Sequence, residues 1–97
     1  MKQLSVYVSR DLESHVVQAL DHAGVDAYLR LGEATGMRST APGPLPRTVS
    51  WDAALYLVPA AEERSIRAVV DALREFAGTC EVGPCLRMVV TPVDEVH

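Results

Sequence analysis

The residues with the clearest capacity for chemistry lie near the end of the sequence, in the segment 79–85 and at Arg87. Gly83 would let the backbone approach a ligand closely, and successive backbone N–H groups in a tight loop form an anion-binding nest. Arg87 would add a positive charge beside that nest. The segment therefore indicates either a site for an anion, such as a phosphate group, or an ordinary turn between a helix and a strand.

The two cysteines of the chain, Cys80 and Cys85, lie in the same segment with four residues between them. Two free thiols, a reversible disulfide and metal ligands are the alternatives for this pair. A turn containing Gly83 and Pro84 would bring the two Cα atoms within disulfide range, and in a reducing compartment such a bond suits a redox sensor. Structural zinc sites favour shorter spacings and need two further ligands, so no metal is expected.

No catalytic constellation is found in the sequence. His15 and His22 lie seven residues apart on one helical face, as histidines on a solvated surface do, and His97 is the last residue. Walker, metalloprotease and serine-nucleophile motifs are absent. We therefore predict that the protein is not an enzyme.

Length and composition indicate one domain, residues 1–97, with a modest core. The net charge of −4 argues against a nucleic-acid partner, because nothing would neutralise the phosphates of a duplex. No apolar run is long enough to cross a bilayer, and the first residues lack the apolar core of a signal peptide. We expect a cytoplasmic protein without direct insertion into a membrane.

The elements that must position these residues follow from hydrophobic periodicity. Apolar residues alternate, as in strands, at 4–8, 25–31, 48–58 and 86–90. They repeat with the period of a helix at 11–23 and 62–77. Gly24 and Gly78 end the two helices and Pro59 ends the third strand. The order β-α-β-β-α-β predicts an α+β, ferredoxin-like domain, an antiparallel four-stranded sheet with both helices on one face.

Two further features of this arrangement bear on function. The segment 32–47 holds three glycines and three prolines, so we expect a mobile loop, and loops of this length are usually functional. The helix-free face of the sheet is expected to carry alternate strand residues such as Tyr7, Tyr28, Trp51 and Met88. An apolar face of this size needs cover, which predicts an oligomer.

The C-terminal string T-C-E-V-G-P-C-L-R-M-V-V-T-P-V-D-E-V, residues 79–96, resembles the end of PII-type signalling proteins. There a T-G-x-I-G-D-G loop leads into a strand that stops at P-V-E-E-V. The sequence of Gly36, Met37 and Arg38 is similar to the G-F-G-R-Q entry of the family's T-loop, so that 32–47 would be a T-loop-like segment. The resemblance implies a homotrimer packed through its sheet faces. It also implies a nucleotide site between subunits, contacted by Gly36, Arg38, Thr79, Gly83 and Arg87.

The function that the resemblance implies is regulatory. Adenine nucleotide would bind between subunits and order the loop, and the ordered loop would control a target membrane transporter or enzyme. Inorganic-carbon uptake is the favoured pathway for that target. The lysine of the family's phosphate loop and its basic C-terminal R-x-R have no counterpart here, which favours ADP or AMP over ATP. The alternatives are a metal-responsive protein resembling CutA or the heavy-metal-efflux-linked PII-like group, with Cys80 and Cys85 as ligands, and a structural trimer without a ligand.

Overall fold

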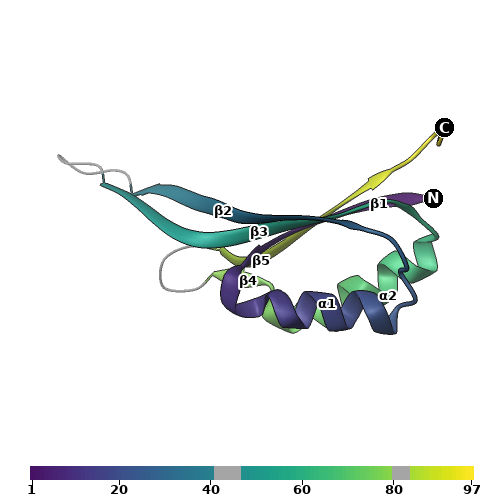
Figure 1. Cartoon of the computed structure of the whole chain (residues 1–97), viewed down its shortest axis with the longest axis horizontal. Helices are drawn as coiled ribbons and strands as arrows, with labels where there is room; N and C mark the ends of the chain where they lie inside the picture. Colours follow the sequence, from purple (N-terminus) through teal and green to yellow (C-terminus); the bar gives the residue numbers. More distant parts are fainter. Residues whose placement is uncertain (41–46, 80–83) are drawn as a thin grey trace.

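The structure is a computed structural model in which residues 1–40, 47–79 and 84–97 are described, and it consists of one sheet and two helices (Figure 1). The strands are β1 (Lys2–Ser9), β2 (Leu29–Thr40), β3 (Arg47–Ala61), β4 (Gly78–Thr79) and β5 (Pro84–Pro92). The helices are α1 (Glu13–His22), entered through a 3-10 turn at Arg10–Leu12, and α2 (Glu63–Leu73), continued by a 3-10 turn at Arg74–Phe76.

The strands form one antiparallel sheet in the order β2-β3-β1-β5-β4. Both helices lie together on one side of it (Figure 1). The four long strands give the predicted ferredoxin-like arrangement, which confirms the fold class. The two-residue strand β4 was not predicted, because two residues are too few to show a period.

The core lies between the sheet and the helices, and it is built almost entirely from aliphatic side chains. Tyr56 is the single aromatic residue among its fully buried members. The cluster is contributed by β1, α1, β3, α2 and β5 and consists of Leu4, Val6, Val8, Val16, Ala19, Leu20, Ala54, Tyr56, Val58, Ile66, Val69, Leu73 and Leu86.

The second strand lies further along the chain than predicted. Residues 25–28 form no regular element, and β2 continues to Thr40, so the expected loop is wrong for 32–40. These residues pair with β3 as far as Thr40 with Arg47. The backbone hydrogen bonds of two long strands satisfy each other, which local glycine content does not reveal. Residues 41–46 lie outside the described residues, and the mobility of the segment stays a prediction.

The paired residues 34–40 and 47–53, here called the arm, extend the sheet beyond the ends of both helices (Figure 1). The molecule is correspondingly elongated, with principal dimensions of 48 × 27 × 22 Å. Pro59 does not end β3 either, because the strand reaches Ala61. The pairing with β1 shifts register between Val58 and Ala61, and this irregularity accommodates the proline.

The arm begins at a β-bulge. Leu31 pairs with Leu55 and Ala34 with Ala53, so β2 holds one residue more than β3 across this step. Within the bulge Glu33 has a φ of 56°, the left-handed region that disfavours residues with a Cβ. The extra residue keeps Leu31 and Ala34 on the same face of the sheet.

Glu33→Gly is expected to raise the free energy of unfolding by about 0.5–1 kcal/mol, because glycine adopts this φ without steric cost. Chemical denaturation at one fixed protein concentration measures it, since assembly would add stability by mass action. Glu33→Ala is the matched control, as it removes the carboxylate but keeps the Cβ, and it should bring no gain. Equal effects of the two variants would contradict the strain at this position.

The cross-strand register assigns each residue to a face of the sheet. Tyr7 and Trp51 lie on the helix-free side, as predicted. The placement of Tyr28 and Met88 there was wrong, because both pack against the core, and Met88 pairs with the buried Val6. The helix-free side, here called the open face, carries Ser5, Tyr7, Leu29, Leu31, Ala34, Gly36, Arg38, Val49, Trp51, Ala53, Leu55, Leu57, Arg87 and Val89.

Candidate ligand-binding site

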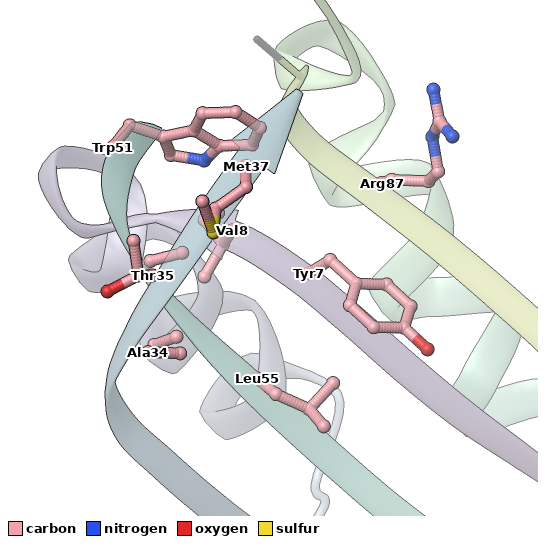
Figure 2. A pocket seen from close by; sticks show the side chains of 11 residues that line it. Tyr7, Val8, Ala34, Thr35, Met37, Trp51, Leu55 and Arg87 are labelled. Atoms are coloured by element: carbon pink, nitrogen blue, oxygen red, sulfur yellow. The ribbon is translucent and has the colours of Figure 1, made fainter. Parts of the chain in front are cut away.

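A hollow of about 390 Å³ lies where the arm joins the body of the sheet (Figure 2). It is lined by Tyr7, Val8, Ala34, Thr35, Gly36, Met37, Trp51, Ala53, Ala54, Leu55 and Arg87. Three rows of cross-strand neighbours explain its shape. Large side chains occupy the rows on either side, and the small pair formed by Ala34 and Ala53 lies between them. The hollow is therefore a dip in the open face with apolar walls.

One wall of the hollow is Trp51, the only tryptophan in the chain. Trp51 pairs directly with Gly36 across the arm. Its indole lies so close over Gly36 that a methyl group at that position would overlap the ring atoms Cε2, Cζ2 and Nε1. Figure 2 shows the indole lying across β2. Because Gly36 has no side chain, the Trp51 indole can pack directly against the backbone at this position.

The opposite wall is a row of residues from three strands. Leu55 of β3 pairs with Tyr7 of β1, and Tyr7 pairs with Arg87 of β5. Tyr7 is half exposed and Arg87 is exposed. Among the described residues that line the hollow, Arg87 is the one that carries a formal charge. The site thus combines aromatic and aliphatic walls with one guanidinium, a composition suited to a ligand with an apolar ring and an anionic group.

The structure brings some of the predicted site residues together. Gly36 and Arg87 line the same hollow, although they are far apart in the sequence. Arg38 lies two residues further out on the arm and is exposed, outside the lining of the hollow. For Thr79 the structure describes the backbone, which pairs with Pro84 in the short strand β4.

The remaining predicted residues concern the cysteine segment. Gly83 and Cys80 lie outside the described residues. Cys85 is at the start of β5 and is buried, with 6% of its surface exposed. The reversible disulfide and the contribution of Gly83 to an anion nest stay predictions.

Sequence analysis did not select Trp51 and Tyr7 as candidate site residues and assigned them to the sheet face alone, whereas both line the hollow. The signal that could have found them is the pairing of a tryptophan with a glycine on the neighbouring strand, an arrangement in which an aromatic side chain covers an exposed glycine. That signal depends on the strand register. The register was hidden because residues 32–40 were interpreted as a loop.

A polar cluster lies on the other side of the sheet, close to the bulge. Arg30 donates hydrogen bonds to Glu13 from Nε to Oε1 at 2.7 Å and from Nη2 to Oε2 at 3.1 Å. The Tyr56 hydroxyl donates to the same Oε1 at 2.7 Å. The Arg30 guanidinium also lies against Gly32, where it fills the space that a side chain would take. The cluster therefore fastens the first turn of α1 to β2 and β3 beside the arm.

The pKa values of the cluster reflect these contacts. The hydrogen bonds from Arg30 hold the pKa of the Glu13 carboxyl below its ordinary value, against the opposite effect of burial. Burial raises the pKa of the Tyr56 hydroxyl, and the carboxylate that it faces raises it further. Glu13 is therefore ionised at neutral pH and is held by two donors.

Within residues 1–40, 47–79 and 84–97, no three side chains of His, Cys, Asp or Glu come together as metal ligands would. Neither helix of the described chain combines the length and hydropathy that a bilayer span requires.

The fold matches that of PII-like proteins of known structure. CPII, a nitrogen regulatory PII-like protein from Thiomonas intermedia K12, solved with ADP, AMP and bicarbonate, is 15% identical, with 99% of this chain and 94% of that chain covered at a TM-score of 0.63. The complex of B. subtilis GlnK with ATP is 8% identical, with coverage of 93% and 80% and a TM-score of 0.67. CPII with ADP, AMP and acetate is 18% identical, with coverage of 97% and 88% and a TM-score of 0.59.

No protein-family model and no curated protein matches the sequence. At the identities of the structural neighbours, the likeness establishes the fold. The resemblance to PII-like proteins noted in the sequence is thus confirmed for the fold.

Proposed function

We propose that this protein is a PII-like regulatory protein that binds adenine nucleotide at the hollow of the open face, between subunits of a homotrimer. The observation that carries the proposal is the meeting of Gly36 and Arg87 in one hollow, in a chain with the fold of proteins solved with ADP, AMP or ATP. Both residues were selected from the sequence as nucleotide contacts. Their convergence from strands β2 and β5 supports a site at this place.

The electrostatics of the hollow favour a nucleotide with few phosphates. The lining contains one guanidinium, that of Arg87, which matches one or two phosphate groups through charge-assisted hydrogen bonds. Arg38 does not line the hollow within one chain. An intersubunit site would let Arg38 of one copy approach the ligand held by another. We therefore propose ADP or AMP as the preferred ligands, with ATP bound no better.

The open face supports the assembly. It exposes large apolar side chains in a continuous area, with relative exposures of 56% for Leu29, 52% for Leu31, 50% for Tyr7 and 42% for Val89. Contiguous apolar surface of this kind marks an interaction site. Copies of the chain that pack these faces together would bury it and would enclose the hollow.

The arm is proposed to transmit nucleotide binding to a partner protein. It projects from the body of the protein and begins at the hollow, so nucleotide binding would bias its conformation. The partner that senses the arm would be a membrane transporter or an enzyme in the cytoplasm, with inorganic-carbon uptake as the proposed pathway. No catalytic activity is proposed.

The test of the nucleotide site is calorimetry with ADP, AMP and ATP. Arg87→Ala is expected to weaken ADP binding by about 1.5–3 kcal/mol, because a charge-assisted contact to phosphate is lost. Arg38→Ala should show a loss of similar size if a neighbouring subunit supplies that residue.

Arg64→Ala is the matched control for both variants, since Arg64 is an exposed arginine on α2 with 91% of its side chain accessible. It should leave ADP affinity unchanged. Absence of heat with all three nucleotides would refute the proposed site, and a clear preference for ATP would show that further cations reach the ligand.

A further inference from the structure

The proposed nucleotide site contains an aromatic surface that nothing in the sequence motifs assigns. Resting on that proposed function, we propose that the Trp51 indole is the base-binding surface of the site, on which the adenine ring stacks. Gly36 is then a positioning residue that seats the indole. The motif of Gly36, Met37 and Arg38 assigned Gly36 as a contact of the nucleotide. In this proposal the nucleotide contacts Trp51 instead.

The first step of the argument is the position of the indole. It covers Gly36 so closely that no atom fits between the ring and the backbone on that side. A ligand entering from the open face therefore meets the indole before it meets Gly36. Trp51 remains partly exposed and lines the hollow, so its ring is accessible from the dip. Aromatic rings accept nucleobases by stacking irrespective of base sequence.

The second step is the space beside the ring. Ala34 and Ala53 form the cross-strand pair beside the pair of Gly36 and Trp51. Their small side chains form the bottom of the hollow and leave space above it. Tyr7 and Leu55 close the far side. The result is an apolar slot with an aromatic wall, which fits the ring of a nucleobase.

The third step is the distance to the charged group. Trp51 lies four residues along β3 from Leu55, and Arg87 lies two strands across from Leu55. With about 3.4 Å per residue and about 4.8 Å between strands, the two Cα atoms are roughly 17 Å apart. Both side chains are long and shorten this span. A nucleotide whose base rests on Trp51 would direct its phosphates toward Arg87.

The experiment uses the fluorescence of the intact protein, since Trp51 is its sole tryptophan. ADP is expected to change the emission of Trp51 on binding, whereas pyrophosphate, which lacks a base, should not. Trp51→Leu should weaken ADP binding roughly five- to 150-fold, the range for alanine substitution at a stacked base. Trp51→Phe, the matched control, retains a ring and should keep affinity within about threefold of the original.

Gly36→Ala supplies an independent variant. Its methyl group must displace the indole, so the expected result is a loss of ADP affinity together with a shift of the Trp51 emission before any ligand is added. Calorimetry with pyrophosphate on each variant reports whether Arg87 still binds its anion. Circular dichroism and light scattering confirm that the variants keep the fold and the assembly state.

The outcomes separate this inference from the proposed function. If ADP binds with no change in Trp51 emission, or if Trp51→Leu binds ADP as well as Trp51→Phe does, the stacking proposal is wrong and the nucleotide site stands. If the unmodified protein binds no adenine nucleotide, the proposed function and the stacking proposal both fail. Tighter ADP binding by Trp51→Leu would mean that the indole blocks Gly36, which also overturns the proposal.

Discussion

Replacing Leu31 by glutamate is expected to dissociate the proposed trimer into monomers of 10.5 kDa. Leu31 lies on the open face beside Leu55, with 52% of its surface exposed in the single chain. The substitution therefore places a carboxylate in water in the monomer, which should fold normally. In an assembly that buries the open face, the same carboxylate would be buried without a partner, at a cost of several kcal/mol in every interface.

Light scattering at micromolar concentration measures this effect. The unmodified protein should have three times the mass of the chain, and Leu31→Glu the mass of one chain. Val17→Glu is the matched control, because Val17 is a similarly exposed aliphatic residue on α1, away from the open face, with 40% exposure. A Leu31→Glu protein that stays trimeric would place the interface elsewhere. An unmodified protein that is monomeric would refute the assembly.

Removal of the Glu13 side chain is expected to destabilise the folded protein. Glu13→Ala leaves the Tyr56 hydroxyl in a largely buried position without its acceptor and separates Arg30 from its carboxylate. The expected decrease in the free energy of unfolding is about 1–3 kcal/mol, mainly from the unsatisfied Tyr56 hydroxyl, because the ion pair with the half-exposed Arg30 contributes little. Glu62→Ala is the control, since its contact with Arg64 is long, at 3.8 Å, and exposed. It should change stability by less than about 0.5 kcal/mol.

The same carboxylate makes stability depend on pH. The pKa of Glu13 is lower in the folded chain than its ordinary value of 4.5. Its contribution is therefore fully present above pH 4.5 and is lost as pH falls through the folded pKa. Glu13→Gln removes this titration, so the difference in unfolding free energy between the two proteins should shrink below pH 4.5. Urea denaturation at several pH values measures it, and a constant difference would contradict the assigned network.

The sequence by itself determined the class of the fold and the order of its elements. The helical stripe of residues 62–77 and the alternation at 4–8 are local signals with a strong period, and both elements formed where they were predicted. Gly24 has the positive φ of 75° that a glycine after a helix is expected to have. These features depend on neighbours within a few residues, which a linear sequence displays directly.

The extent of the arm was decided only by the tertiary structure. Glycines at 32 and 36 argue locally for a loop, but the pairing of β2 with β3 satisfies the backbone, and Trp51 covers Gly36 from the other strand. The bulge at Glu33 then sets which side chains reach the open face. A one-residue change of register reverses the face of every later residue, so the face of a strand residue follows from its pairing partner.

Some residues of the candidate site were selected from the sequence, and others were recognised only from the tertiary structure. Gly36 and Arg87 were found from motifs along the chain, because each stands in a short string with a recognisable order of residue types. Trp51 and Tyr7 join them only through the strand register, and the link from Glu13 to Arg30 and Tyr56 spans three elements. Contacts between residues far apart in sequence have no local period. The sequence therefore determined which elements form, and the packing of those elements decided which side chains meet.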